Sequence, residues 1–180
     1  AELYSYWTWI PAFLAASALA RSGTAPPWVS VLAFATVAIG GVGCVWGGLV
    51  ADRIGRARLT IIAMAASAAC ALLVAFAFGG SWWLLAPLAL AWGFFVIADS
   101  AQFSVLATES VPPHAVGTAL ALQTSLGFLL TTLTIQFVPP VVQLGGWPVA
   151  FALLAIGPLL GIRSMRALGR IANSEVQTAN

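Results

Sequence analysis

Apolar residues run along this chain in six long blocks, and a short stretch of polar or turn-forming residues follows each of the first five. A helix needs ~20 predominantly apolar residues to cross a bilayer. The blocks that reach about this length cover residues 2–20, 28–51, 59–79, 82–107, 115–140 and 147–165. The pattern therefore predicts an all-α integral membrane protein with six transmembrane helices.

The breaks between the blocks contain residues that end or bend helices. Four of them are rich in glycine or proline, at Gly23 to Pro27, Gly79-Gly80, Pro112-Pro113 and Gly145-Gly146. The second break, from Asp52 to Arg58, is charged instead.

Composition restricts the class of protein. The chain is 61% hydrophobic and 7% charged, it contains no lysine, and its mean hydropathy is +1.00. So few charges cannot cover the surface of a soluble domain, so the expected solvent is the lipid bilayer. The net charge of +2 indicates no nucleic-acid partner, because the arginines lie at the ends of apolar blocks rather than on one face.

Few residues are available for metal, redox or catalytic chemistry. Cys44 and Cys70 both lie inside apolar blocks, where a small hydrophobic side chain is the simplest interpretation. His114 is the only histidine, so zinc or haem would have almost no ligands. No nucleophile motif stands out. The sequence predicts no cofactor, no metal and no enzyme.

The distribution of arginine predicts the orientation in the membrane. An even number of helices places both termini on one side, together with the second and fourth breaks. That side holds Arg53, Arg56, Arg58, Arg163, Arg166 and Arg170, whereas Arg21 lies opposite. Both termini are therefore expected in the cytoplasm.

The charged break follows the spacing G-x-x-x-D-R-x-G-R-x-R, formed by Gly48, Asp52, Arg53, Gly55, Arg56 and Arg58. It resembles the signature loop of the major facilitator superfamily of secondary transporters, which joins the second and third helices of each six-helix half. Gly48 is expected to let helices approach closely, Gly55 to permit a tight turn, and Asp52 to hold arginines or cap a helix. A generic positive loop is the alternative.

A second stretch is similar to the facilitator turn written E-x-x-P-x-x-x-R-G. Glu109, Pro112 and Gly117 match this pattern, whereas Val116 occupies the arginine position. The resemblance implies that Glu109 lies beside the arginine loop and completes an ion-pair lock for a cytoplasmic gate. Exposed ion pairs contribute only about 0–1 kcal/mol each, so such a lock needs several partners.

The first block, ELYSYWTWIPAF, resembles the seventh helix of some bacterial facilitators. By that resemblance the helix begins several residues upstream of Ala1, and the absence of an initial methionine leads us to expect a fragment or a chain whose upstream residues are missing. Glu2 would then lie within the membrane as a candidate for proton coupling. If Ala1 is a true terminus, Glu2 is an interfacial charge.

Two polar faces are candidates for the solute path. In the first block, Tyr4 and Thr8 share a helical face with Pro11, and Trp7 lies beside them; an interfacial aromatic belt is the alternative. In the fourth block, one stripe contains Trp92, Phe95, Asp99 and Gln102. An ionisable group inside a span, here Asp99, predicts a functional site, although a structural buried carboxylate is the alternative.

The resemblance covers nearly the whole chain and implies the C-terminal six-helix half of a facilitator. The expected fold is a bundle over residues 1–170, built as a 3+3 inverted repeat with triplets at about 1–79 and 82–170. A polar tail covers 171–180. In this fold the first helix of each triplet lines the path and the third lies outermost.

The expected function is secondary active transport of a small solute by alternating access, with protons as the candidate coupling ion, in a bacterial inner membrane. Because the cavity of such transporters lies between two halves, a partner is needed: an N-terminal six-helix half, a second copy, or a larger complex. The alternative function is a non-transporting scaffold subunit of a respiratory or photosynthetic assembly.

Overall fold

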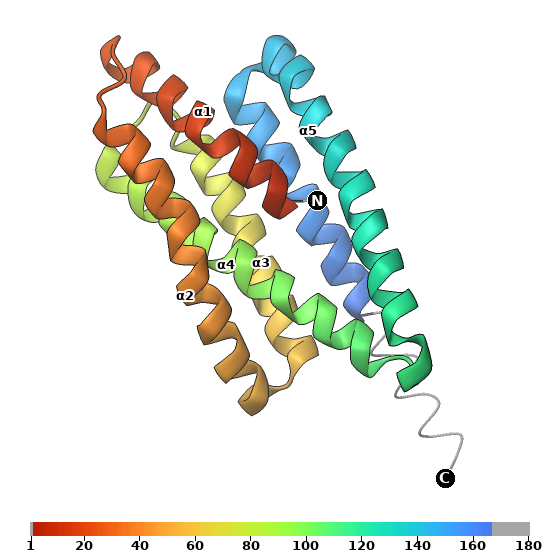
Figure 1. The fold of residues 1–180 in the computed structure, drawn as a ribbon. Coiled ribbons are helices and arrows are strands. Elements are labelled where there is room, and N and C mark those ends of the chain that lie inside the picture. The colour runs from red at the N-terminus through yellow and green to blue at the C-terminus, as the bar shows by residue number, and fades with distance from the viewer. Residues whose placement is uncertain (1, 167–180) are drawn as a thin grey trace.

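A computed structural model describes residues 2–166, and every regular element in that range is helical. The elements are α1 (Glu2–Ser22), α2 (Trp28–Ile54), α3 (Arg56–Phe76), α4 (Trp82–Glu109), the short 3₁₀ helix η1 (Pro113–Ala115) and α5 (Val116–Leu154), after which residues 156–166 are also helical. Figure 1 shows them as an elongated bundle. The predicted tail at 171–180 and Arg170 lie outside the described residues.

Four helical runs in the described range are long and apolar enough to cross a membrane, namely Trp28–Ile54, Arg56–Phe76, Trp82–Glu109 and Pro113–Arg166. The α1 helix is also 21 residues long, but it carries Glu2, Arg21 and several hydroxyl side chains. These lengths and compositions support an all-α integral membrane protein.

The α5 helix differs from its predicted boundaries. The sequence predicts an end at 140 and a new helix at 147, whereas helical structure continues past Pro139 and Pro140, so the predicted end is wrong. Proline lacks an N–H donor and crowds the carbonyl oxygen four residues earlier, but helices in a membrane tolerate this where neighbouring groups satisfy the freed carbonyl. Gly146 (φ 77°, ψ 176°) is the non-helical residue inside α5. In Figure 1 the ribbon reverses direction where the colour of α5 turns from cyan to blue. The six-helix count and the 3+3 repeat stay predictions.

The charged break is a one-residue turn. The α2 helix ends at Ile54, Gly55 adopts φ 90° and donates its N–H to the carbonyl oxygen of Ala51, and α3 starts at Arg56. A positive φ favours glycine because it has no Cβ. The turn therefore places Asp52 in the last turn of α2 and Arg56 at the first position of α3.

Glycines let α2 and α4 pack with their backbones close together. A Cβ on Gly43 would collide with the carbonyl oxygen of Phe94, and one on Gly47 would lie 3.1 Å from the carbonyl oxygen of Ala98. On the facing helix, a Cβ on Gly93 would collide with the carbonyl oxygen of Thr36. This is the small-residue packing by which membrane helices associate.

Two expectations about packing stay predictions. Within residues 2–166 a Cβ on Gly48 would meet no atom within 4 Å, whereas Gly43 and Gly47 face α4. Ten of the 21 residues of α3 are buried, and it packs against α4 and α5. Its many alanines suit this interior position because they let neighbouring helices approach.

Aromatic side chains in the core join α1, α4 and the second arm of α5 (residues 147–154); the first arm covers residues 116–145. The ring of Phe13 stacks on Phe151 at a centroid distance of 4.1 Å, and Trp92 lies 5.5 Å from Phe151 and 4.6 Å from Tyr6. The Tyr6 hydroxyl donates to the carbonyl oxygen of Ala89 at 2.9 Å. These contacts hold Trp92 fully buried at the centre.

Candidate functional site

Three residues from three helices form what we call the interior cluster: Glu2 of α1, Ser67 of α3 and Trp92 of α4. The carboxylate oxygen Oε1 of Glu2 accepts a hydrogen bond from Ser67 Oγ at 2.7 Å and another from Trp92 Nε1 at 3.0 Å. Trp92 Nε1 also lies 3.1 Å from Ser67 Oγ. Ser67 and Trp92 are fully buried.

The interior cluster lies near the middle of the neighbouring spans. Ser67 comes eleven residues after the first residue of α3, and Trp92 ten residues after the first residue of α4. At ~1.5 Å per residue these positions are roughly 15 Å from the helix ends, about half of a ~30 Å hydrocarbon core. Glu2 therefore contacts its donors at mid-depth, and the start of α1 lies half-way along the bundle in Figure 1.

Asp99 and Gln102 are buried one and two turns further along α4 than Phe95, with 6% and 2% of their surface exposed. Both ion pairs within the described residues belong to Arg56, and neither includes Asp99. A carboxylate with so little exposure and no counter-charge in residues 2–166 is costly in a membrane. Asp99 is therefore the strongest single candidate for a functional group.

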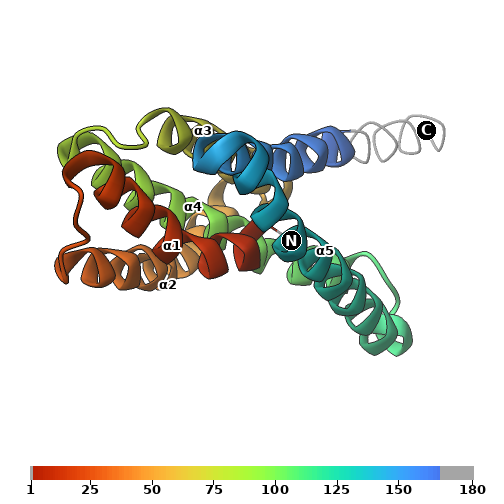
Figure 2. The ribbon, with the colours of Figure 1, turned by 90° about the horizontal axis from the view of Figure 1, so that it is seen from above.

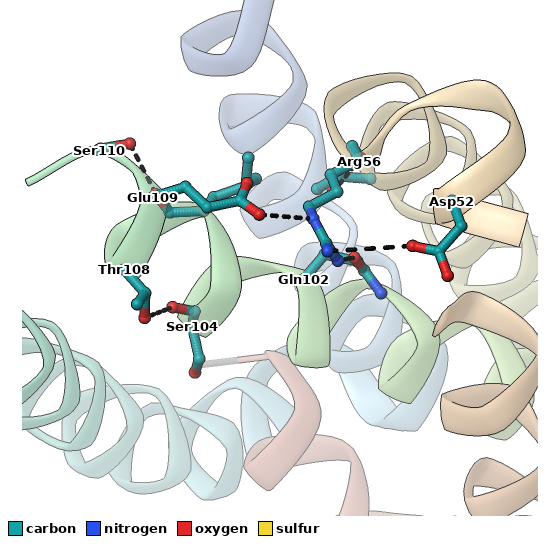
Figure 3. A network of polar contacts seen from close by, with 9 residues as sticks. Asp52, Arg56, Gln102, Ser104, Thr108, Glu109 and Ser110 are labelled. Atoms are coloured by element: carbon teal, nitrogen blue, oxygen red, sulfur yellow. Dashed lines mark hydrogen bonds and ion pairs between the residues drawn. The ribbon is translucent and has the colours of Figure 1, made fainter. Parts of the chain in front are cut away.

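A second group, the Arg56 cluster, lies at the end of the bundle that holds the α2–α3 turn (Figure 3). Arg56 Nε donates to Glu109 Oε1 at 3.0 Å, Nη2 lies 3.9 Å from Asp52 Oδ1, and Nη1 donates to Gln102 Oε1 at 3.5 Å. One guanidinium thus contacts the ends of α2 and α4 from the start of α3.

The other members of the charged loop take no part in this cluster. Arg53 and Arg58 are exposed, and within residues 2–166 neither forms an ion pair. Of the three arginines expected to meet Glu109, only Arg56 does so. A role of these residues in a gate stays a prediction.

The exposed face of α1 is separate from the interior cluster. Tyr4 and Trp7 are 39% and 36% exposed, and the ring of Tyr4 lies 5.6 Å from Trp7 and 5.3 Å from Phe128 of α5. Thr8 is also exposed, and its hydroxyl donates to the carbonyl oxygen of Tyr4. In the described part of the chain, no hydrogen bond or ring contact joins these three residues to Trp92, Asp99 or Gln102.

Phe95, the remaining member of the predicted path, faces α2. Its ring lies 6.3 Å from Trp46 and 5.2 Å from Phe94, both in edge-on arrangements. The predicted path residues are thus distributed over an interior group, an α1 face and an α2–α4 contact.

Sequence reasoning missed Ser67 and Tyr6 as contacts of the site. Serine in an apolar helix commonly bonds to its own backbone, so spacing alone gives no signal for Ser67. Tyr6 carries no sequence signal that separates it from an aromatic residue at the membrane interface. Its 0% exposure depends on packing between helices that are distant in sequence.

At the opposite end of the bundle, α1 is joined to the turn between α3 and α4. The Arg21 guanidinium donates to the carbonyl oxygen of Gly80, and the backbone N–H of Gly79 donates to Ser17 Oγ at 2.8 Å. These contacts fix the C-terminal end of α1.

Membrane-length apolar helices, glycine-mediated packing and buried polar groups at mid-depth describe an integral membrane protein with a polar interior. No group of three or more potential metal ligands occurs within residues 2–166. The model of the family described as "Sugar (and other) transporter" matches residues 3–168, so the chain belongs to this family.

The match confirms the predicted relationship to the major facilitator superfamily. It also confirms that the chain is not an enzyme, because the family consists of transporters. No curated protein and no solved structure shows significant similarity to this chain.

Proposed function

We propose that the chain is the C-terminal half of a secondary transporter that moves a small solute by alternating access, with Asp99 as the group that takes up a proton or binds a charge on the solute. The observation that carries this proposal is the burial of Asp99 without a counter-charge in the described residues. Family membership supports transport as the general activity.

The cytoplasmic closure is proposed to use the Arg56 cluster. Its three contacts join the ends of α2, α3 and α4, so separating these ends requires breaking all three. Because Gln102 is both buried and in contact with Arg56, it would connect the buried polar residues of α4 to this closure.

The other half of the cavity is proposed to come from an N-terminal six-helix half or a second copy. Large apolar side chains are exposed on α2 and on the first arm of α5, among them Phe34, Val45, Leu126, Leu130 and Phe137. Lipid or a second half would cover them. We also propose that the protein lies in a bacterial inner membrane, as the resemblance implies, and that both termini are cytoplasmic, as the arginine distribution predicts.

Uptake by the Asp99→Asn variant tests the function. Uptake of a panel of solutes is first measured in vesicles that contain the complete transporter, so that a transported solute is identified. The panel starts with monosaccharides, following the family description. Asp99→Asn should then abolish uptake driven by a proton gradient, with insertion into the membrane unchanged. Normal gradient-driven uptake in this variant would remove Asp99 from the mechanism. Asp99→Glu, which keeps a carboxylate at this position, is the matched control and should retain gradient-driven uptake.

The scaffold function remains the second candidate, and the same exposed side chains of α2 and α5 favour it. The intact mass of the native protein, and the identity of the proteins that copurify with it, distinguish the scaffold function from transport. Fixed stoichiometry with a larger respiratory or photosynthetic complex would support the scaffold. A subunit with twelve helices would support transport.

A further inference from the structure

Exposed arginines gather where α3 and the helix over residues 156–166 approach the end of the bundle that holds the α2–α3 turn. They are Arg58 of α3 and Arg163 and Arg166 of the 156–166 helix, and we call them the outer arginines. In Figure 1, α3 starts at that turn, and the 156–166 helix, in blue, runs toward the same end of the bundle. Three positive charges therefore lie on two antiparallel helices at one end of the molecule.

The two helices are in contact, and the contact brings the outer arginines to a similar depth. A Cβ on Gly161 would collide with the side chain of Met64, and Ile162 is buried. Arg58 comes six residues before Met64, and Arg166 five residues after Gly161. At ~1.5 Å per residue, these positions are about 9 Å and about 7.5 Å from the contact. Both lie on the side of the α2–α3 turn.

Each helix also has exposed apolar residues directly next to its arginines. Ile62 follows Arg58 by one turn on α3, and Leu159 and Leu160 precede Arg163 by one turn on the 156–166 helix; all three are more than half exposed. Residues three or four positions apart lie on the same face of a helix. The outer surface of both helices is therefore apolar along the span and positively charged at its end.

This surface lies away from the regions that a second half would cover. Figure 2 shows the 156–166 helix at one edge of the bundle, whereas α2 and the first arm of α5 lie toward the other side. Those two elements carry the apolar side chains for which a second half is proposed. We therefore expect the surface around the outer arginines to face lipid.

The acidic residues at this end of the bundle do not neutralise the outer arginines. Both ion pairs within residues 2–166 belong to Arg56, with Asp52 and Glu109 as its partners. The sequence after residue 166 adds one arginine and one glutamate, so it leaves the net charge of this end unchanged. An anion is the ligand that the excess positive charge favours.

We propose that the outer arginines bind the phosphate of an anionic phospholipid whose acyl chains lie along the exposed apolar faces of α3 and the 156–166 helix. A guanidinium matches the geometry of a phosphate group, and basic residues between helices at the membrane surface attract anionic headgroups. A soluble anion would match the arginines but not the apolar faces. The site is independent of the proposed transport mechanism, because it contains neither Asp99 nor Arg56.

Native mass spectrometry of the full protein in detergent tests this site. The dissociation constants of phosphatidylglycerol and phosphatidylcholine with identical acyl chains are measured for the wild type and the variants. Arg58→Gln and Arg166→Gln should each weaken phosphatidylglycerol binding about fivefold, because one arginine near a phosphate contributes about this factor. Binding of phosphatidylcholine, which has no net charge, should not change.

Arg53→Gln is the matched control, because Arg53 is exposed in the same loop but lies on α2. It removes the same charge and should leave phosphatidylglycerol binding unchanged. An equal loss in this variant would show attraction to the overall charge and overturn the proposed site. Unchanged phosphatidylglycerol binding in both Arg58→Gln and Arg166→Gln would also overturn it.

Two further measurements separate the proposal from misfolding and from binding of a soluble anion. Arg58→Lys and Arg166→Lys keep the charge and should retain most of the phosphatidylglycerol affinity, whereas a loss as large as that of the glutamine variants would contradict the role of charge. Inorganic phosphate should not displace phosphatidylglycerol, because it has no acyl chains. Displacement at equal concentrations would show an anion site without lipid and overturn the proposal.

Discussion

The interior cluster and the Arg56 cluster each join three helices through carboxylate hydrogen bonds, but they lie in different surroundings. In the interior cluster, the buried Ser67 and Trp92 donate to Glu2 at mid-depth. In the Arg56 cluster, the side chains of Asp52 and Glu109 are 73% and 54% exposed. Water and salt compete with the second cluster but not with the first.

This difference shows that formal charge is a poor guide to stabilisation. The Arg56 cluster contains the ion pairs, yet each exposed pair contributes only about 0–1 kcal/mol. The interior cluster contains neutral donors, yet the loss of one leaves a polar group unsatisfied in an apolar medium. We expect the interior cluster to stabilise the fold, and the Arg56 cluster to remain easy to open.

The largest expected effect comes from Trp92→Phe. The ring keeps most of its packing, but the Nε1 donor to Glu2 and its contact with Ser67 are lost. We expect the free energy of unfolding to fall by about 1–2 kcal/mol. Unfolding in mixed detergent micelles measures it. Trp83→Phe, at a residue that is 92% exposed, is the control and should change nothing.

Ser67→Ala should have a smaller effect of about 1 kcal/mol, because Glu2 keeps its hydrogen bond from Trp92. The same unfolding assay measures it, with Ser164→Ala as the control, since that exposed hydroxyl donates only to its own helix backbone. A loss no larger than that of the control would show that Ser67 is not a structural partner of Glu2.

Glu109→Gln should have the smallest effect on stability, below about 1 kcal/mol, because the pair with Arg56 is exposed. The effect should shrink further between low and high salt as the charges are screened. Measuring the unfolding free energy of the wild type and the variant at two salt concentrations checks this. A large, salt-independent loss would show that the two clusters do not differ as described.

The charged turn was largely predictable from the sequence. The pattern around Gly55 requires a tight turn between two apolar blocks, and the structure places α2 and α3 on either side of that residue. The reversal at Gly146 coincides with the break predicted at Gly145-Gly146. The helix before it was predicted to end at residue 140, because Pro139 and Pro140 are strong local signals for a helix end, but it continues through them.

The interior cluster could be predicted only in part. Glu2 and Trp92 stand out in the sequence because a carboxylate and an indole are unusual inside a span. Their contact joins residues 90 positions apart, and it depends on how α1 packs against α4. The partner Ser67 gives no local signal, since its position matters only after three helices have come together.

The α1 helix is anchored near both ends. Glu2 is hydrogen-bonded to α3 and α4 at one end, and Arg21 and Ser17 are bonded to the α3–α4 turn at the other. Between these anchors Pro11 lacks an N–H, so the carbonyl oxygen of Trp7 loses its helical partner. Pro11 is therefore the position, within the described part of α1, at which we expect this helix to bend most easily.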